Sequence, residues 1–597
     1  MTMASHRTTP ILLLISLLLC CAAHSAKGDD VSLAVIQIEG TPAEVEVGYS
    51  WIGDGTETLM GIINTIDTLS YDKEFSGLVI RLKDSALSTT QVEEIGSAID
   101  RLRRNDKPVH IFAEGYNTTD LLLASYADEI ILQEGGYVSF PGLHAEELYL
   151  ADTLEWLGVK AQLVQVGDFK GANEQMTRAT PSPAWEENIS ALLDSMYENM
   201  RSIILEGRGM SERELDAAME EIWSASGQEA IDAGVIDSVV DLPDLRDHLS
   251  DEYDADITWV SDPYDIGDSS VSTISPFAIF SGIASPQRQQ VHIDHPTIAV
   301  LHINGTIIDG DSTTGGLLGG SDSVGSRTIR NAIESILAED LIKGVIVRIN
   351  SPGGSAVASE MMWQGIERLK EEKPVWVSVG NIAASGGYYV LSAGDRVFVN
   401  PSSVVGSIGV VGGKYAMGEL YEKAKIHVVE RSRGPMGGLF SSTRGWDSDQ
   451  LALMRSEMTE TYDLFTSRVE AGRSGIDLSK TAEGRLFVGQ DAIDLNMADE
   501  IGGIDDAVNE LASEVELGDF DVVHFPQPPS IEEVLMEQFG RFLRSPQIAI
   551  DVHPLEGMLR GALGDERFES IADSLNGLLL LRKERVLLVS PRVLYFH

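Results

Sequence analysis

Two corners of small residues are the places in this chain where backbone and side chain could act together. Residues 350–355 read Asn-Ser-Pro-Gly-Gly-Ser, and residues 383–388 read Ala-Ala-Ser-Gly-Gly-Tyr. Gly353 and Gly354 can adopt positive φ and direct an N–H into open space, where it could bind an oxyanion. Ser385 would expose a hydroxyl where a helix begins. One corner could therefore hold the oxyanion of an acyl-transfer intermediate, and the other could supply the nucleophile.

The elements around these corners fit that chemistry. Apolar runs at 344–349 and 375–379 lead into the corners, and residues able to form a helix follow each one, which predicts two strand-to-helix turns. The N–H of Gly386, directly behind the serine, is a further candidate donor to the oxyanion. Alone, each corner is typical of an ordinary turn or of a helix N-cap. Their separation by one strand and one helix is what favours a catalytic site.

The chain contains an internal repeat. Residues 33–40 (Leu-Ala-Val-Ile-Gln-Ile-Glu-Gly) match residues 298–305 (Ile-Ala-Val-Leu-His-Ile-Asn-Gly), and residues 77–81 match residues 344–348. Further matches follow at a nearly constant offset over roughly two hundred residues. The repeat predicts two copies of one α/β domain in tandem.

The two copies differ at the corners. In the first copy the segment that faces the glycine corner reads Asp-Ser-Ala-Leu (84–87), and the position that faces Ser385 is Thr118. The first copy therefore lacks both the oxyanion corner and the serine. We interpret Thr118 as a residual polar corner.

With these corners and the run Gly-Ser-Ile-Gly-Val at 406–410, the chain closely resembles signal peptide peptidase A (protease IV), a family of Clp-protease-like serine peptidases. The first corner is also shared with the Clp proteolytic subunit and, more loosely, with the crotonase group. The resemblance covers nearly the whole chain after its leader. It implies an α/β fold of two tandem Clp-protease/crotonase-like domains built from ββα spiral units, with Ser385 as the nucleophile.

The same resemblance points to Lys170 as the general base. In the short members of the family a lysine in a Gly-x-Tyr-Lys-like motif follows the serine, and Lys170, in Gly-Asp-Phe-Lys-Gly, lies 52 residues after Thr118, which is the family's spacing. The same distance after Ser385 lands on Gly437. Each copy thus keeps the half of a Ser-Lys dyad that the other has lost, and the two domains must meet, within one chain or between chains.

A lysine that acts as a base has to be buried. A free lysine has a pKa of about 10.4, so desolvation must favour its neutral form at neutral pH. It also needs a hydrogen-bond partner that does not restore its charge, and Ser407 corresponds to the family's lysine-orienting serine. Gly406 and Ile408 flank this serine, and the run that they belong to could offer an edge strand to an extended peptide substrate.

Histidine is the other candidate base. Clp-type enzymes place a histidine after the serine, but the corresponding position here is Val410, and the next histidine downstream is His427. His427 lies in the strand-like segment 426–430. We therefore interpret it as a structural strand residue.

The composition argues against some partners. The 597 residues include 93 acidic and 44 basic side chains, a formal net charge of −49, which disfavours nucleic-acid binding through phosphate neutralisation. Such an acidic, lysine-poor surface suggests a protein that works in concentrated salt, where self-repulsion is screened. We find no cluster of metal ligands and no phosphate-binding loop in the sequence, so no metal or other cofactor is predicted.

The first 26 residues have the plan of a secretory signal. Arg7 precedes the apolar run 11–23, which is shorter than the roughly 20 residues that span a bilayer, and small residues for cleavage follow. We expect cleavage, with an uncleaved membrane anchor as the alternative, and a catalytic part on the extracytoplasmic side of the cell envelope. The only cysteines are Cys20 and Cys21, so the cleaved chain would have neither a disulfide nor a thiol nucleophile.

The expected organisation has five segments. They are a leader or anchor at 1–26, a first, lysine-donating domain at 30–241, a linker at 242–296, a second, serine-donating domain at 297–516 and a C-terminal extension at 517–597.

The resemblance implies that the protein digests released signal peptides and assembles as a ring-like homotetramer at the membrane surface. Two other classes stay open: a crotonase-like acyl-CoA enzyme, and a non-catalytic scaffold of the cell envelope. The match is looser just after Lys170, where residues 171–178 depart from the family's Ser-Ala-x-Glu-Pro-Phe-x-Arg.

Overall fold

The computed structural model describes residues 28–45, 58–261, 263–264, 293–313, 322–527 and 586–590. The predicted leader at 1–26 lies outside these residues. Among the described residues no helix is both long and apolar enough to cross a membrane.

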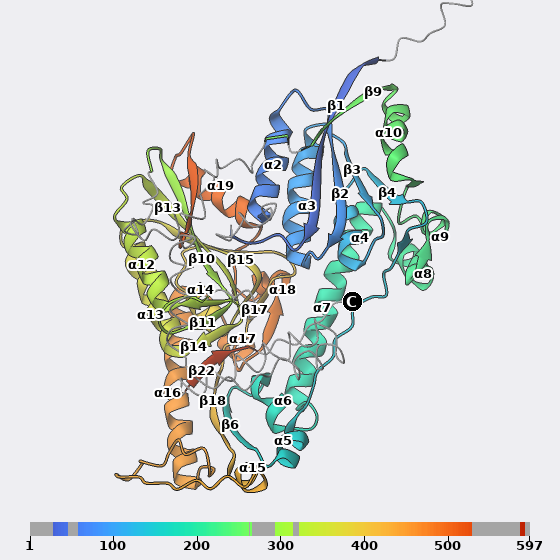
Figure 1. The fold of residues 1–597 in the computed structure, drawn as a ribbon. Helices are drawn as coiled ribbons and strands as arrows, with labels where there is room; N and C mark the ends of the chain where they lie inside the picture. The colour runs from blue at the N-terminus through green and yellow to red at the C-terminus, as the bar shows by residue number, and fades with distance from the viewer. Residues whose placement is uncertain are drawn as a thin grey trace, which may run out of the picture.

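The first domain is built on a parallel six-stranded sheet with the strand order β8-β4-β3-β2-β1-β9 (Figure 1). Its strands are β1 (Gly28–Gly40), β2 (Gly77–Ser85), β3 (Val109–Ala113), β4 (Glu129–Gln133), β8 (Ser238–Val240) and β9 (Ala255–Ser261). The central strands are buried on both faces of the sheet, which is why their sequences are almost continuously apolar instead of alternating.

Helices cover both faces of this sheet. One face packs against α2 (Leu59–Tyr71), α3 (Thr89–Arg104) and α4 (Thr118–Ala124), and the other packs against α10 (Leu245–Tyr253). The domain also contains α8 (Glu212–Ile222), α9 (Gly227–Asp232), the short helix η3 (Leu242–Asp244), and a small sheet of β5 (Tyr137–Val138) and β7 (Ala225–Ser226).

The second domain repeats this plan, which confirms the predicted tandem α/β organisation. Its eight-stranded sheet has the main order β19-β17-β15-β13-β10-β21, with β16 beside β15 and β20 beside β16. The strands are β10 (Thr297–Asn304), β13 (Ile342–Ser351), β15 (Val375–Ala384), β16 (Val397–Val399), β17 (Val404–Gly406), β19 (Leu486–Val488), β20 (Glu500–Ile501) and β21 (Asp521–Phe525).

Helices again lie on both faces. One face packs against α12 (Ser326–Leu337), α13 (Ala356–Lys370), α14 (Gly386–Leu391) and α16 (Ser448–Gly472), and the other against α19 (Ile504–Glu514). Three short helices complete the domain: α15 (Gly418–Lys423), α17 (Leu478–Thr481) and α18 (Gly489–Asp494).

A third sheet joins the two copies. Its strand order is β12 (Ser323–Gly325), β11 (Thr306–Ile308), β14 (Gly353–Ser355), β22 (Val586–Val589), β18 (Val410–Ala416) and β6 (Lys160–Val166). The last strand comes from the first copy and pairs antiparallel with β18, from Val166 opposite Val410 to Lys160 opposite Ala416. The first copy therefore reaches across and completes a sheet of the second.

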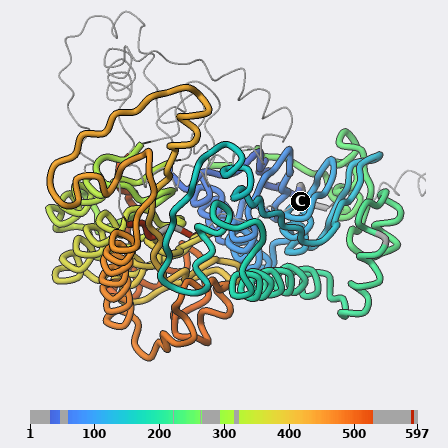
Figure 2. The backbone as a smooth tube through the Cα atoms, turned by 90° about the horizontal axis from the view of Figure 1, so that it is seen from below, coloured from blue at the N-terminus to red at the C-terminus, as the bar shows by residue number. Residues whose placement is uncertain are grey.

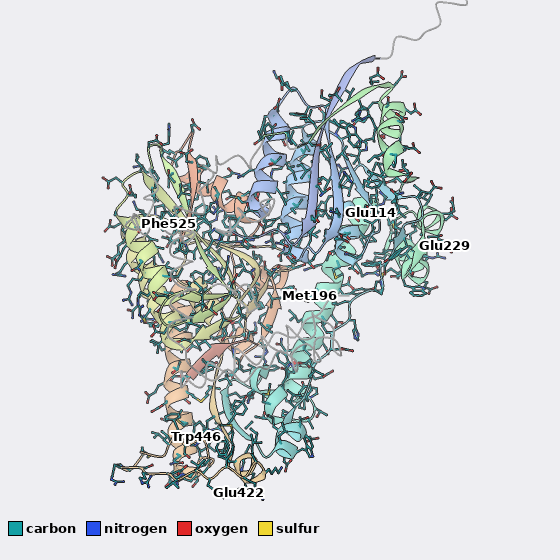
Figure 3. All side chains as sticks on the ribbon, viewed as in Figure 1. Glu114, Met196, Glu229, Glu422, Trp446 and Phe525 are labelled. Atoms are coloured by element: carbon teal, nitrogen blue, oxygen red, sulfur yellow. The ribbon has the colours of Figure 1, made fainter. Side chains whose placement is uncertain are left out.

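The segment around β6 packs as an arm against the second domain. It comprises α5 (Ala151–Leu157), β6, η2 (Gly171–Asn173), α6 (Glu174–Thr177) and α7 (Pro183–Arg208). Figure 2 shows this arm in teal between the rest of the first domain, in blue and green, and the orange helices of the second. One face of α7 is buried against β17 and β19, at the place where Met196 lies in Figure 3.

A buried ionic network also joins the domains. Arg348, on β13, is fully buried and binds two carboxylates of the first copy, Glu44 at 3.0 Å and Glu94 at 2.8 Å. Next to it, Glu93 accepts hydrogen bonds from the Ser402 backbone N–H (3.1 Å) and hydroxyl (2.6 Å). Burial raises the pKa of Glu93 to about 8. This network fixes α3 against the second domain.

The structure corrects two of the expected boundaries. The linker predicted from residue 242 is wrong over its first part, because 242–261 form η3, α10 and β9, and β9 pairs with β1. The extension predicted from residue 517 is also wrong, because β21 pairs with β10 at the edge of the second sheet and β22 lies inside the third. In both copies the chain returns after its last helix to pair with the copy's first strand, a contact between segments more than two hundred residues apart.

Candidate active site

The two glycine-containing corners meet at one edge of the second sheet. Parallel pairing of β13 with β15 brings their carboxyl ends together, with Ser351 opposite Ala383. Ser385 follows β15 directly and lies at the N-terminus of α14, with φ 55° and ψ −112°. A non-glycine residue at positive φ is strained, and such strain concentrates at functional sites. The Ser385 side chain is fully buried, and its backbone N–H donates to Gly406 O at 2.8 Å.

Gly353 lies where the two corners touch. Its φ is +96°, and a Cβ at this position would come within 2.0 Å of Leu588 O and 2.5 Å of Gly386 N. Only glycine fits, because both the backbone angle and the space exclude a side chain. The Gly353 N–H donates to Ser351 Oγ at 3.2 Å. Gly386 opens a helix, so its N–H has no acceptor within that helix and is suited to an oxyanion.

Ser351 belongs to the first corner, but its type and position in the sequence did not predict a role of its own. Its hydroxyl donates to Gly305 O at 2.7 Å and accepts from Gly353, so it fixes the corner to the end of β10. Gly354, the next residue, is paired in the third sheet opposite Ile307 and Leu588. A serine in a turn has no spacing that would have revealed this role.

Lys170 reaches the serine from the other copy within the same chain. Its Nζ lies 2.7 Å from Ser385 Oγ, 2.8 Å from Ser407 O and 2.9 Å from Ser407 Oγ. The side chain is fully buried, and burial lowers the pKa of Lys170 well below its ordinary value. Among the described residues, no carboxylate forms an ion pair with it. The structure thus brings together the pair that the family resemblance implied and desolvates the amine.

Two glycines shape the approach of the lysine. A Cβ on Gly484 would lie 2.5 Å from Lys170 N, and a Cβ on Gly171 would lie 2.3 Å from the Trp185 ring. Trp185 belongs to α7, whose N-cap Ser182 and first-turn proline set where that helix begins. The departure from the family motif at Gly171 therefore has a physical reason: this chain packs a tryptophan where a side chain would otherwise be.

Ser407, whose two oxygens contact the Lys170 amine, lies between Gly406 and Ile408. Ser407 has φ 52°, and its N–H donates to Arg485 O at 2.5 Å. Gly406 has φ +102°, and Ile408 is buried while its carbonyl accepts from Gly484 N–H at 2.8 Å. The lysine contact to the Ser407 carbonyl was not predicted, because a backbone acceptor leaves no mark in the sequence.

The position between β14 and β18 in the third sheet is occupied by β22. β22 pairs antiparallel with both, with Gly354 opposite Leu588 and Val411 opposite Leu587. Both leucine side chains are fully buried, and Ser590 N–H donates to Pro352 O at 2.9 Å. An extended apolar segment therefore lies beside the two corners, in the manner of a strand added to a sheet.

The corresponding corner of the first copy is closed to this chemistry. Thr118 begins α4 and is buried, and the nearby Ser85 hydroxyl donates to the carboxylate of Asp120. The interpretation of His427 as a strand residue is wrong, because 426–430 form no strand and are exposed. His427 is therefore not part of this site.

The arrangement suits base-assisted attack by a hydroxyl. A neutral amine has two N–H groups and one lone pair, and the two oxygens of Ser407 are placed to accept the two N–H groups. The lone pair is then left for the proton of the Ser385 hydroxyl. Gly386 and the Gly353 corner border the place where the carbonyl oxygen of Leu588 lies.

Comparison with known proteins identifies the family of this chain. The model of peptidase family S49 matches residues 101–256 and 367–518. Protease 4 of Salmonella typhi is 26% identical over 499 residues, which cover 82% of this chain and 77% of that protein. Protease 4 of Haemophilus influenzae is 29% identical over 75% of this chain and 72% of that protein.

A plant relative matches as well. The chloroplastic serine protease SPPA of Arabidopsis thaliana is 26% identical over 74% of this chain and 63% of that protein. The family match falls once in each copy and together covers more than half of the chain. The protein is therefore a serine protease of peptidase family S49, with two S49 domains in tandem.

Proposed function

We propose that the protein is an endopeptidase in which Ser385 is the nucleophile and Lys170 is the general base. The observation that carries this proposal is the 2.7 Å contact between the Lys170 amine and the Ser385 hydroxyl in a fully buried setting. Burial lowers the pKa of Lys170, so its neutral form can accept a proton at moderate pH.

The reaction begins when the Ser385 oxygen attacks a peptide carbonyl and its proton passes to Lys170. The N–H of Gly386 and the N–H groups of the Gly353–Gly354 corner stabilise the oxyanion, after the corner turns its Gly353 N–H from Ser351 to the substrate. Lys170 then gives its proton to the leaving amine. Water hydrolyses the acyl-enzyme with Lys170 again as base.

The substrate is an extended peptide with apolar residues beside the serine. β22 supplies the pattern, because it pairs along β14 and β18 and buries Leu587 and Leu588. Released signal peptides have this character, since their central region is apolar. We place this activity at the cell envelope, in accord with the secretory plan of the leader.

We also propose that the protein assembles head to tail into a ring of identical chains, for which the family resemblance suggests four copies. The repeat supports this. Gly158 and Gly167 flank β6 at φ +82° and +109°, and Lys425 and Gly434, both also at positive φ, take their places in the second copy at an offset of 267.

At this offset residues 427–433 correspond to β6, and residues 143–149 correspond to β18. Residues 427–433 are all exposed, and 143–149 alternate between half-buried and exposed, as an edge strand does. Each chain thus contains one β6–β18 pairing within itself. It also contains the two segments, 143–149 and 427–433, that correspond to a second pairing of the same kind. These segments on neighbouring chains can pair, and a rotation that closes gives a ring.

Fluorophosphonate labelling combined with peptide cleavage tests the dyad. We expect the native enzyme to be labelled at Ser385, and Ser385→Ala and Lys170→Ala to lose cleavage by roughly 10⁴-fold or more. Thr118→Ala is the matched control, since it removes the hydroxyl at the same place in the first copy and should leave activity unchanged. Intact cleavage in Lys170→Ala would contradict the assignment of the base.

The same experiment separates the other classes. A crotonase-like acyl-CoA enzyme would turn over without labelling at Ser385, and a scaffold would neither label nor cleave. The S49 family match and the fully desolvated Ser-Lys contact both favour the peptidase.

A further inference from the structure

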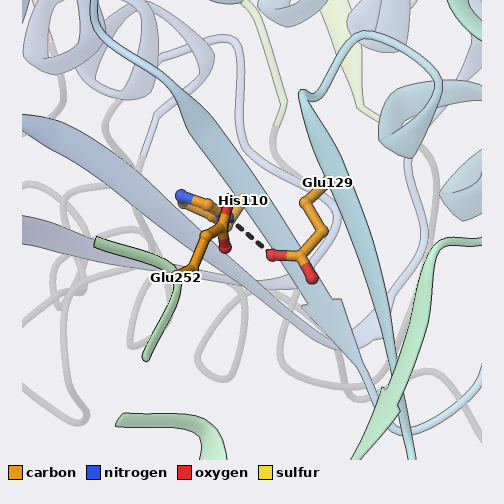
Figure 4. Close-up of side chains that lie close together, drawn as sticks. All are labelled: His110, Glu129 and Glu252. Atoms are coloured by element: carbon orange, nitrogen blue, oxygen red, sulfur yellow. Dashed lines mark hydrogen bonds and ion pairs between the residues drawn. The ribbon is translucent and has the colours of Figure 1, made fainter. Parts of the chain in front are cut away.

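The face of the first sheet that α10 covers carries a cluster of imidazoles and carboxylates, away from the candidate active site. His110 on β3 lies opposite Glu129 on β4, and their side chains meet at 2.9 Å, from His110 Nδ1 to Glu129 Oε2. α10 covers this face and brings His248 and Glu252, one helical turn apart. His248 Nε2 lies 2.7 Å from Glu129 Oε1, and Glu252 Oε2 lies 3.8 Å from His110 Nδ1 (Figure 4).

We propose that His110, Glu129 and Glu252 bind a divalent transition-metal ion of the zinc class, with His248 as the outer partner that orients Glu129. One ligand atom from each of the first three residues lies within 4.8 Å of the others. Ligands in a tetrahedral zinc site, with bonds of about 2.0–2.1 Å, are about 3.3 Å apart, and the distances of 2.9 and 3.8 Å lie on either side of that value. An imidazole ligand beside carboxylates favours zinc over calcium or magnesium, which prefer oxygen ligands.

Glu252 places a second carboxylate beside Glu129 and His110. Glu129 by itself already accepts from His110, from His248 and from the Ser238 hydroxyl at 2.9 Å. Glu252 adds a negative charge beside it. A cation between the two carboxylates removes this repulsion.

The surroundings have the other features of a metal site. His110 Nε2, the nitrogen away from the carboxylates, lies 3.0 Å from the Tyr253 hydroxyl, so it can donate its proton there while Nδ1 binds the ion. The His110 side chain is buried, whereas His248 and Glu252 are 31% and 48% exposed, which leaves an entry path for the ion.

The second domain shows that the fold itself does not require these polar residues. At the places of His110 and Glu129 the second copy has Trp376 and Arg396, and there the arginine stacks on the tryptophan at 4.8 Å. The helix that covers that face, α19, packs Leu511 beside Trp376. The polar set is therefore specific to the first copy, where an ion would fix α10, and with it β9, to the sheet.

Calorimetric titration of the chelator-treated full-length protein with ZnCl₂ tests the site. We expect a single strong Zn²⁺ per chain, undisturbed by excess Mg²⁺. Glu252→Gln and His248→Gln should each weaken it by at least about tenfold, as loss of even an outer-shell partner does. Asp251→Asn is the matched control, because it removes the same charge from the neighbouring exposed position on α10 and should leave binding unchanged.

Thermal unfolding gives a second readout that is independent of catalysis. Zn²⁺ should raise the melting temperature of the native protein and of Asp251→Asn, but not that of Glu252→Gln. Labelling at Ser385 should persist in all variants, which shows that they fold. Absence of a strong Zn²⁺ site, or equal weakening in Asp251→Asn and Glu252→Gln, would overturn the proposal and leave only diffuse binding to an acidic surface.

Discussion

The chemistry of the candidate site depends on one amine without a counter-ion. Lys170 is held by the hydroxyl of Ser385 and by two oxygens of Ser407, none of which carries a charge. A carboxylate in the same place would stabilise the ammonium form and abolish the base.

This setting predicts a pH profile. Because burial lowers the pKa of Lys170, the amine loses its proton on folding at a pH where a free lysine keeps it. The kcat/KM for a peptide substrate should therefore rise with pH through one deprotonation below about 10.4 and then level off.

Lys170→Arg separates the role of charge from that of shape. Arginine stays protonated at every accessible pH, so this variant should be inactive throughout the profile. A rate that fell as pH rose through the same range, or an active arginine variant, would contradict a lysine base.

Gly353 predicts a second effect at the scale of single residues. A methyl group there would meet Leu588 O at 2.0 Å and Gly386 N at 2.5 Å, so Gly353→Ala should lose most of its peptidase activity. Gly310→Ala is the matched control. Its φ of +98° is nearly the same, but no atom lies within 4 Å of the added Cβ, so it bears only the backbone strain. Equal loss of activity in both variants, measured with one peptide substrate, would show that strain and not the corner is responsible.

Among the elements, β22 is the one for which we predict an effect on substrate binding. It pairs with both β14 and β18, where we propose that an extended substrate binds, so we expect it to compete with substrate. A chain truncated after residue 585 should have a lower KM for extended apolar peptides, with kcat changed less. A synthetic peptide of residues 586–597 should inhibit the truncated enzyme competitively.

The alternative is that β22 only stabilises the third sheet. In that case truncation would lower the melting temperature without lowering KM, and the peptide would not compete. The melting temperature and the KM, each measured for the full-length and the truncated chain, decide between these roles.

At the scale of the molecule, the two copies divide one site. β6 of the first copy pairs with β18 of the second, and this contact carries Lys170 to Ser385 within a single chain. The buried network around Arg348 holds the same interface from its other side. The counterpart interface between chains would join 427–433 to 143–149 and would contain Thr118 and Gly437 in place of the dyad, so we expect one active site per chain.

Assembly is tested by proline substitutions in the exposed segment 427–433. Val428→Pro removes a backbone donor inside the segment 427–433 and should shift the protein toward single chains in size-exclusion chromatography with light scattering. Arg433→Pro, at the last residue of the segment and exposed as well, should have a smaller effect. Labelling at Ser385 should survive in both. An unchanged mass in Val428→Pro, or a native protein that is already a single chain, would contradict the proposed ring.

The sequence by itself determined the tandem copies, both corners and the lysine candidate, because these depend on residue type and on spacing along the chain. Glycines at positive φ and a serine before a helix are local requirements, and the repeat preserves them at a readable offset. The family resemblance, read through the spacing of its lysine, also indicated that Lys170 and Ser385 belong together.

The tertiary structure alone decided where the domains end, which strand lies between β14 and β18, and which groups contact the Lys170 amine. β9 and β21 pair with strands more than two hundred residues earlier in the chain. β22 likewise pairs with β14, which is distant from it in the sequence. The lysine's contact to the Ser407 carbonyl and the packing of Gly171 on Trp185 are likewise long-range. Such contacts are set by which surfaces meet when the chain packs, and no local pattern of residues encodes them.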